Sequence, residues 1–356
     1  MLYSGIDLHK RFSFITTVDE QGKVLSQVKV RNDDQAVLKY FASFNQPHQA
    51  VVECTMNWYW IADLLNDHDF PCVVAHAKYL KAISYAKVKT DNVDSLTLAQ
   101  LLRMDYIPAS YQVPAHLRPL RDLMRQRLRF VAKRTSHLVW VHMTLGKYNI
   151  KLPGQYPLNH PESFQALRKL DIPKPAQLGI RLHLQNIRLL NRQIKLLEKT
   201  IKPQLRPTKQ TQLLLSVPGI GEIAAATILL ETGTIDRFAD DKHFASYCRS
   251  VPGSADSGGR HKLKHTPKDG NRYLKYVFTE SALKAIIYYA QIKQFYQRKL
   301  RKTNAAVART IVAKELARIV YYVLTREEPF KNFKGIAVNK SESWPRLARP
   351  VRYEVI

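Results

Sequence analysis

The chain has 356 residues, of which 45% are hydrophobic, and a formal net charge of +27. This composition supports two or three domains with proper cores and excludes disorder over most of the length. No uninterrupted apolar stretch approaches the roughly 18–20 residues of a membrane helix, so we expect a protein that is soluble and not exported. Cys54, Cys72 and Cys248 lie far apart, which predicts buried, reduced thiols in the cytoplasm and neither a disulfide framework nor a zinc site.

The positive charge is confined to one part of the chain. Residues 1–110 carry 12 acidic and 11 basic side chains, so residues 111–356 carry 17 acidic and 45 basic ones. A field of that size attracts polyanions, and without a lipid-directed segment the expected polyanion is DNA or RNA. Residues 1–110 have nearly balanced charge, so we expect them to serve a different function from the basic part of the chain.

Residues 1–112 are predicted to form one α/β domain. Strands are expected at 2–8, 12–18, 24–30, 50–52 and 72–75, with helices at 35–44 and 57–66. The first three strands, joined by short turns, indicate an antiparallel meander. The later strands alternate with helices, which favours parallel pairing through crossover helices. This order of elements is typical of a ribonuclease-H-like (RuvC-like) domain.

Pro108 and Pro114 mark a boundary, after which residues 113–207 are predicted to form a helical or coiled-coil arm. Two long helices are expected, at 117–147 and 176–202, separated by a loop at 153–161. The first helix carries the candidate nucleic-acid-binding residues Arg118, Arg121, Arg125, Arg129 and Arg134. The alternative is a solvated charged face, but such a face normally mixes signs.

Residues 208–328 are predicted to form a third, helical domain, followed by a tail at 329–356. Pro218-Gly219-Ile220-Gly221 lies between two helical segments, as in a helix-hairpin-helix, where Gly219 and Gly221 would let backbone N–H groups approach a phosphate. The same turn could merely connect two core helices. A glycine-rich loop at 251–260 precedes long helices at 271–297 and 304–325. Further candidate nucleic-acid-binding residues follow within and after this loop: Arg260, Lys262, Lys264, Lys268 and Arg272.

Four carboxylates in residues 1–112 fall where metal-dependent phosphodiester chemistry would need them. Asp7 and Glu53 each end a predicted strand, and Asp91 and Asp94 lie three residues apart at the start of a helix predicted at 94–103. Together they could bind two Mg²⁺ ions roughly 3.5–4 Å apart. Each has a simpler interpretation as a helix cap, a turn residue or a surface acid. The coincidence of all four favours the metal site.

The motifs, in this order, resemble the IS110 family of insertion-sequence transposases, including its IS1111-type branch, over essentially the whole chain. The matching segments are 5–10 (Gly-Ile-Asp-Leu-His-Lys), 52–53, 89–95 with 98–99, 217–221, and 257–259 with 268–274. Residues 247–252 depart from the run that many members carry before the serine loop, which bears on the branch more than on the chemistry.

The resemblance implies a fold and a mechanism. It implies a RuvC-like domain with a D-E-D-D set at Asp7, Glu53, Asp91 and Asp94, a helical arm, and a transposase domain with the serine nucleophile Ser257. It also implies site-specific recombination of double-stranded donor and target DNA, directed by a non-coding guide RNA. The setting would be the nucleoid-associated cytoplasm of a bacterium or archaeon. A homo-oligomer is expected, a dimer or a tetramer in the synaptic complex, and could form a composite active site.

Two serines, Ser254 and Ser257, lie in the same loop, and the position of Ser257 matches that of the family's serine. Ser257 stands five residues after Pro252 and directly before Gly258, as the family's serine does, and the glycine would let the backbone approach a scissile phosphate. A hydroxyl is a poor nucleophile at neutral pH, so activation by the carboxylate-bound metal is the expected route. Storing the phosphodiester bond in a protein–DNA ester would allow rejoining without ATP.

Three other classes of protein compete with this interpretation. A RuvC-like Holliday-junction resolvase or nuclease would need the four carboxylates but not Ser257. An ATPase of the actin and sugar-kinase superfamily would place small residues after Asp7, where this chain has Leu8-His9-Lys10. A non-catalytic DNA or RNA binder would explain the charge but leave the carboxylates without a purpose.

Overall fold

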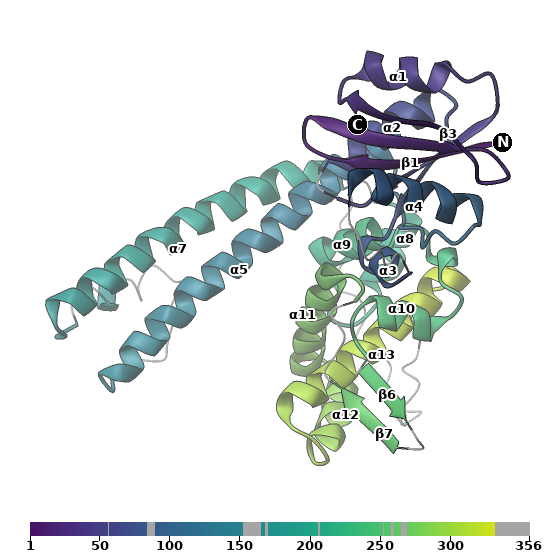
Figure 1. Ribbon diagram of the computed structural model, residues 1–356. Helices are drawn as coiled ribbons and strands as arrows, with labels where there is room; N and C mark the ends of the chain where they lie inside the picture. Colours follow the sequence, from purple (N-terminus) through teal and green to yellow (C-terminus); the bar gives the residue numbers. More distant parts are fainter. Residues whose placement is uncertain are drawn as a thin grey trace. The chain divides into compact units, whose positions relative to one another are not determined.

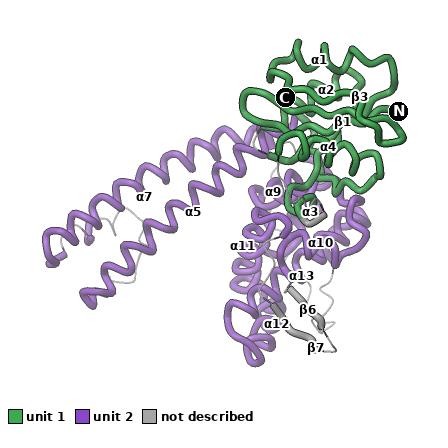
Figure 2. Tube along the Cα trace, viewed as in Figure 1, with its two compact units in different colours: residues 1–115 green, residues 116–356 purple. Residues whose placement is uncertain are grey.

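The computed structural model describes residues 1–55, 57–83, 90–151, 165–167, 170–205, 207–251, 253–257, 260–264 and 269–331. For residues 82–83, 253–257 and 260–264 it describes the backbone alone. The chain divides into two compact units, Met1–Ala115 and His116–Ile356 (Figure 2). None of the described helices combines the length and hydrophobicity that crossing a bilayer requires.

Unit 1 is built on a mixed five-stranded sheet. Its strands are β1 (Leu2–Leu8), β2 (Phe12–Val18), β3 (Val24–Arg31), β4 (His48–Glu53) and β5 (Cys72–Ala75). The order across the sheet is β3-β2-β1-β4-β5. The β1–β2 and β2–β3 pairs are antiparallel, whereas β4 pairs parallel to both β1 and β5. The prediction of an antiparallel meander followed by parallel strands is confirmed.

Helices cover both faces of this sheet (Figure 1). On one face, α1 (Asp34–Ala42) and α2 (Trp58–Asp67) bury Phe41 and Ile61 against Ile6 and Val52. On the other face, α4 (Asp91–Arg103) packs Leu98 near Val51. A shorter helix, α3 (Ala77–Ile83), follows β5. The strands β1, β4 and β5 therefore contribute side chains to two separate apolar layers, as the twofold alternation of strand side chains allows.

The helix that carries Asp91 and Asp94 begins three residues earlier than predicted. Thr90 has an extended backbone, and its hydroxyl accepts a hydrogen bond from the Val93 N–H at 3.3 Å, so it caps the helix. Asp91 is the first helical residue, and both aspartates lie in the first turn. Two negative charges in that turn also favour the helix through its dipole.

Unit 2 contains two long helices that form the arm, α5 (Arg118–Lys147) and α7 (Lys174–Ile201), which lie side by side (Figure 1). At one end of the pair, Val141 and Leu145 are buried with Ile180 and Ile187. Nearer the start of α5, Met124 is buried in a cluster with residues of α7 and of α9 (Glu222–Thr232). The loop predicted at 153–161 falls outside the described residues.

The remaining helices of unit 2 form an apolar cluster around α11 and α13. They are α8 (Lys209–Leu215), α9 (Glu222–Thr232), α10 (Asp241–Tyr247), α11 (Arg272–Tyr288), α12 (Ala290–Leu300) and α13 (Ala305–Arg326). Short 3-10 turns lie at Ala115–Leu117, Lys202–Gln204 and Ile235–Arg237. The core is centred on fully buried Phe244, Phe278 and Leu316. Most of the predicted tail, 332–356, falls outside the described residues.

Three further expectations about local structure were wrong. The helix predicted at 271–297 is two helices, because Tyr289 is extended (φ −120°, ψ 109°) and packs against the core; it follows a β-branched and aromatic run that forms helix poorly. The segment predicted as a glycine-rich loop pairs as an antiparallel hairpin of β6 (Gly253–Ser257) and β7 (Arg260–Lys264). Two glycines between alternating runs are typical of a hairpin connection. Cys72 and Cys248 are buried as expected, but Cys54 is exposed.

Candidate metal centre and basic surface

The sheet brings the first two predicted carboxylates to one edge. Ile6 of β1 pairs with Val52 of β4, so Asp7 and Glu53 follow next to each other at the carboxyl ends of parallel strands. Because strand side chains alternate, Glu53 lies on the same face as Val51, the face that α4 covers. Asp7 lies on this face too, because it is two residues after Gly5 in the strand. Gly5 faces α4, since a Cβ on Gly5 would lie 2.0 Å from the Ser95 carbonyl oxygen of that helix.

The helix that supplies the other two carboxylates is fixed to the sheet by close packing and polar contacts. Gly5 lets the α4 backbone approach β1 closely, as only a residue without a side chain can. The Thr16 and Ser95 hydroxyls are hydrogen-bonded at 2.8 Å, and the Gln27 side-chain amide donates to the Asn92 carbonyl at 3.0 Å. These contacts hold the first turn of α4 in place at the end of β1.

Asp7, His9 and Asp91 form a compact set of possible metal ligands. One ligand atom from each residue lies within 4.8 Å of the other two. The His9 Nε2 atom is 3.2 Å from Asp7 Oδ2 and 3.3 Å from Asp91 Oδ1, and it makes no hydrogen bond of good geometry. All three side chains are partly buried. The two carboxylates and the imidazole nitrogen are all ligands that divalent cations take in proteins, so this set would suit a divalent cation.

The electrostatics of Asp7 agree with a cation site. Burial raises the pKa of the Asp7 carboxyl above its ordinary value of 3.8, and the negative charges of Asp91 and Asp94 raise it further. His9 acts in the opposite direction. The negative charges of Asp91 and Asp94 beside the Asp7 carboxylate carry an energetic cost, which a bound cation would relieve. The residues therefore fit a divalent metal ion.

Asp94 and Glu53 lie outside the compact set. Asp94 is close enough for its charge to act on Asp7, and Glu53 is half-buried at the end of β4. A second ion with these two residues as ligands stays a prediction. The structure thus brings Asp7, Asp91 and Asp94 into one electrostatic cluster and places Glu53 at the same sheet edge.

His9 was not singled out as a ligand from the sequence. Its backbone carbonyl accepts hydrogen bonds from the side-chain amides of Asn32 at 2.8 Å and Asn57 at 2.9 Å. Its ring lies against Phe12 and Phe14, with centroid distances of 5.1 and 6.2 Å. The one available signal was its place two residues after the strand-end aspartate, within the motif at 5–10.

Ser257 is the last residue of β6, where it pairs with Arg260 of β7. In the same hairpin, Lys262 pairs with Ala255 and Lys264 with Gly253. The side chains of these residues are not described, and Gly258 and Lys268 fall outside the described residues altogether. The roles of Ser257 as nucleophile and of Arg260, Lys262, Lys264 and Lys268 as nucleic-acid contacts stay predictions.

The arginines predicted to bind nucleic acid occupy different environments along α5. Arg118 is buried, Arg121 is partly buried, and Arg134 donates to Asn191 of α7 at 3.0 Å. Arg129 is exposed, and its closest described polar contact is the Tyr273 hydroxyl at 3.5 Å. Of these four, Arg129 has the side chain most open to a ligand.

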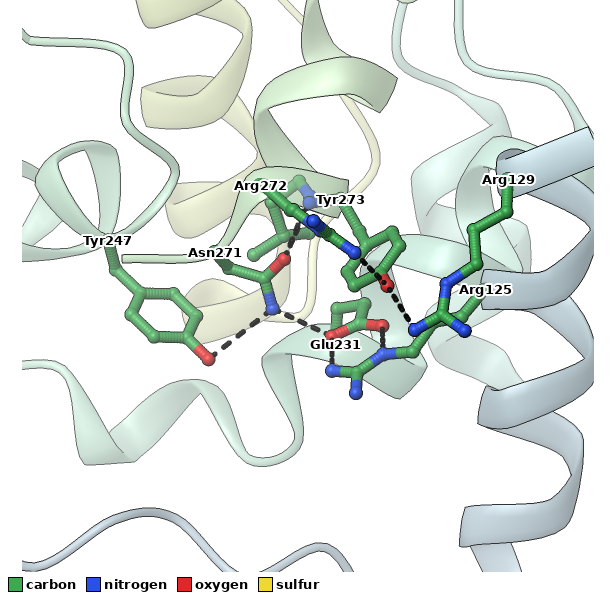
Figure 3. Close-up of polar contacts among 8 residues, drawn as sticks. Arg125, Arg129, Glu231, Tyr247, Asn271, Arg272 and Tyr273 are labelled. Carbon is green, nitrogen blue, oxygen red and sulfur yellow. Dashed lines mark hydrogen bonds and ion pairs between the residues drawn. The ribbon is translucent and has the colours of Figure 1, made fainter. Parts of the chain in front are cut away.

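Arg125 forms an ion pair with Glu231, a buried acid that the sequence analysis did not single out. Its Nε and Nη2 atoms donate to the two carboxylate oxygens of Glu231 at 2.6 and 2.7 Å, and the Glu231 side chain is 2% exposed (Figure 3). Asn271 donates to the same carboxylate at 2.7 Å and caps α11 by accepting from the Tyr273 and Leu274 N–H groups. One carboxylate thus joins α5, α9 and the start of α11.

The two glycines of the predicted helix-hairpin-helix turn differ in what surrounds them. A Cβ on Gly219, which has φ +81°, would lie 2.2 Å from the Ser281 carbonyl oxygen and 3.0 Å from the Ala285 nitrogen of α11. Packing alone therefore accounts for Gly219. Gly221 caps α9, and a Cβ there would meet open space. A phosphate contact by either glycine stays a prediction, and Gly221 is the more accessible one.

The comparisons with known proteins agree with these features. Residues 4–150 match the DEDD model for IS110 elements, described as "Transposase", and residues 211–297 match "Transposase IS116/IS110/IS902 family". A probable family 20 transposase of Pseudomonas aeruginosa is 24% identical over 92% of this chain and 98% of its own length. The transposase for insertion sequence element IS1111A of Coxiella burnetii is 20% identical over 92% and 90%. The chain therefore belongs to the IS110 family of transposases and is an enzyme of DNA recombination.

Proposed function

We propose that this transposase cuts and rejoins DNA with divalent metal, Mg²⁺ in two sites, held by Asp7, Glu53, Asp91 and Asp94 in a RuvC-like domain. The convergence of Asp7 and Asp91, with Asp94 acting on Asp7, is the observation that carries the proposal. The sheet order supports the fold, since an antiparallel meander flanked by two parallel strands is the arrangement expected of a ribonuclease-H-like domain.

The chemistry at this site divides between metal and protein. Bound Mg²⁺ would stabilise the charge that develops on the attacking and leaving oxygens of a phosphodiester. Asp7 Oδ2 and Asp91 Oδ1, which both lie near His9 Nε2, would be the protein atoms that hold it. Their positions are set by the β1 terminus and the packing of α4 on Gly5, so the carboxylates are oriented before the cation arrives.

We propose Ser257 as the nucleophile that conserves the phosphodiester bond. The Ser257 Oγ would form an ester with the scissile phosphorus as the bond to the leaving DNA oxygen breaks, and that oxygen would take up the serine's proton. The reverse attack by a DNA hydroxyl restores a phosphodiester and frees the serine. The number of ester bonds is unchanged throughout, so strand exchange needs no ATP. The family motif supports this assignment.

The Ser257 assignment predicts a covalent protein–DNA adduct. Incubated with substrate DNA, guide RNA and Mg²⁺ and then denatured, the wild-type protein should retain DNA on the peptide containing Ser257. Ser257→Ala should lose the adduct completely while still binding DNA, and Ser254→Ala, the matched control in β6, should retain it. Mass spectrometry of the digested adduct makes the measurement. An adduct on Ser254, or strand exchange by Ser257→Ala, would overturn the assignment, and hydrolysis alone by that variant would favour a RuvC-like nuclease.

We further propose that donor and target DNA and an element-encoded guide RNA are the nucleic-acid partners, and that the protein acts as a homo-oligomer. The excess of basic residues after position 110 supports the first part. RNA that copurifies with the protein should match DNA flanking the gene when it is sequenced. Copurified RNA of random cellular origin would count against guidance by the element. Mass photometry of the protein with RNA and DNA tests the oligomer.

A further inference from the structure

Three side chains from two distant parts of the sequence converge on one point of unit 2. Arg129 of α5 and Arg272 of α11 both donate to the Tyr273 hydroxyl oxygen, from Nη2 atoms at 3.5 and 3.0 Å (Figure 3). Arg129 and Arg272 are exposed and Tyr273 is partly buried. The fold thus brings together two basic residues that are 143 positions apart in the sequence.

This group of side chains offers hydrogen-bond donors without a matching acceptor. A guanidinium has donors only, and the phenol oxygen, already accepting from both arginines, has its own O–H left to donate. Among the residues that the structure describes, no carboxylate pairs with Arg129 or Arg272, and no acceptor is found for the Tyr273 hydroxyl proton. Two positive charges aimed at one neutral oxygen repel each other, and an anion would relieve that repulsion.

The neighbouring ion pair separates this group from the rest of the network. Arg125 lies over the Tyr273 ring at 4.7 Å, but its charge is paired with the buried Glu231 carboxylate. Arg125 therefore supports the tyrosine ring, while Arg129 and Arg272 keep uncompensated charge at the hydroxyl. The two arginines also lower the pKa of Tyr273, although burial acts in the opposite direction. The surroundings of this hydroxyl favour negative charge.

We propose that Arg129, Arg272 and Tyr273 form a clamp for a single phosphodiester group of a nucleic-acid backbone. A phosphodiester has two unesterified oxygens, which can each accept from one guanidinium, and the tyrosine O–H can donate to either. The clamp deepens the proposed function and rests on it only in taking nucleic acid as the ligand. Arg129 belongs to the arm, and Arg272 lies at the start of α11, shortly after the hairpin that carries Ser257. A nucleic-acid strand bound by the clamp would therefore contact both the arm and the serine-bearing domain.

Binding to a fluorescent DNA duplex and to an RNA stem of equal length, measured by anisotropy over a range of salt concentrations, tests the clamp. Arg129→Gln and Arg272→Gln should each weaken binding of the clamped nucleic acid about tenfold, as expected for losing a hydrogen bond to a charged group. Because both arginines hold one phosphate, the double variant should lose clearly less than the roughly hundredfold of two independent contacts. If the substitutions weaken binding of only one of the two probes, DNA or RNA, that probe identifies the nucleic acid that supplies the phosphate.

Matched variants separate the clamp from general loss of charge. Lys133→Gln and Lys275→Gln remove exposed charges from the same two helices. The fold-losses in binding affinity of these two single variants should multiply in their double variant, as for independent contacts. Tyr273→Phe should weaken binding about threefold to tenfold without changing the salt dependence, because it removes a neutral donor. Thermal unfolding checks that each variant is folded.

The outcomes are distinguishable. If the wild type binds and the arginine variants bind equally well, or if their effects multiply like those of the lysines, the clamp is wrong and the proposed function stands. If the wild type binds neither DNA nor RNA, the proposed function fails. Tight binding of polyglutamate that the arginine variants lose would indicate an acidic protein partner and overturn the phosphate clamp.

Discussion

Replacing Glu231 with glutamine is expected to lower the free energy of unfolding of unit 2 by about 3–5 kcal/mol, the usual cost of breaking a buried ion pair. The Glu231 carboxylate is 2% exposed and accepts from two Arg125 nitrogens and from Asn271. Glutamine keeps the size of the side chain but leaves the Arg125 guanidinium without its countercharge. It also presents an amide to the Asn271 cap of α11, so the start of that helix should loosen with the arm.

Urea unfolding followed by circular dichroism measures this effect, and the arm supplies a matched control. Arg127 donates to Glu198 at 2.6 Å, but these side chains are 18% and 31% exposed. Glu198→Gln should therefore cost no more than about 1 kcal/mol. Equal losses in the two variants would mean that Glu231 is not the buried connection between α5, α9 and α11 that its contacts indicate.

Replacing Asp7 with asparagine is expected to lower the rate of DNA strand cleavage on the order of 10³-fold. A bound metal ion contributes several kcal/mol to stabilising transition-state charge, and each 1.36 kcal/mol corresponds to a tenfold change in rate. Asparagine keeps the shape of the side chain but removes the charge that would hold the cation. Cleavage of substrate DNA by protein carrying its RNA measures the effect, and Asp34→Asn, at an exposed first-turn position of α1, is the control.

The same substitution should stabilise the protein when metal is removed with a chelator. The folded-state pKa of Asp7 is raised above its ordinary value of 3.8, so the ionised carboxylate costs stability at neutral pH. The contribution of Asp7 to the free energy of unfolding is fully present at acidic pH, where the carboxyl is protonated, and is lost as the pH rises through the folded-state pKa. Asp7→Asn should therefore raise the melting temperature at neutral pH, and the gain should vanish below the ordinary pKa. A lower melting temperature at neutral pH would contradict the repulsive cluster.

Local patterns predicted most of the elements of unit 1. The strand at 72–75 and the first two strands agree with the sequence-based ranges, because alternating apolar residues and short turns specify them within a few positions. The start of α4 was missed since Thr90 competes with Asp91 as a cap, and the sequence does not show which side chain folds back. Tyr289 broke a helix that periodicity alone would continue.

Residues that act through long-range contacts could not be predicted in the same way. Glu231 is one acid near the end of an apolar helix, and its partners Arg125 and Asn271 are 106 and 40 residues away. The meeting of Arg129 with Tyr273 likewise depends on how α5 and α11 pack. His9 lies close to Asp7 in sequence, but its contact with Asp91 depends on the placement of α4 against β1. The strand-end carboxylates were predictable because parallel strands end at one edge.

The central claim, that Asp7 and Asp91 hold a catalytic divalent cation, is tested most directly by Mn²⁺ binding, followed by the electron paramagnetic resonance signal of the free ion. Mn²⁺ takes the same oxygen ligands as Mg²⁺. The wild type should bind Mn²⁺ saturably and release it to Mg²⁺. Asp7→Asn and Asp91→Asn should each weaken binding by about tenfold or more, while Asp34→Asn should bind as the wild type does. Mn²⁺ affinity that is unchanged in both Asp7→Asn and Asp91→Asn would contradict the claim.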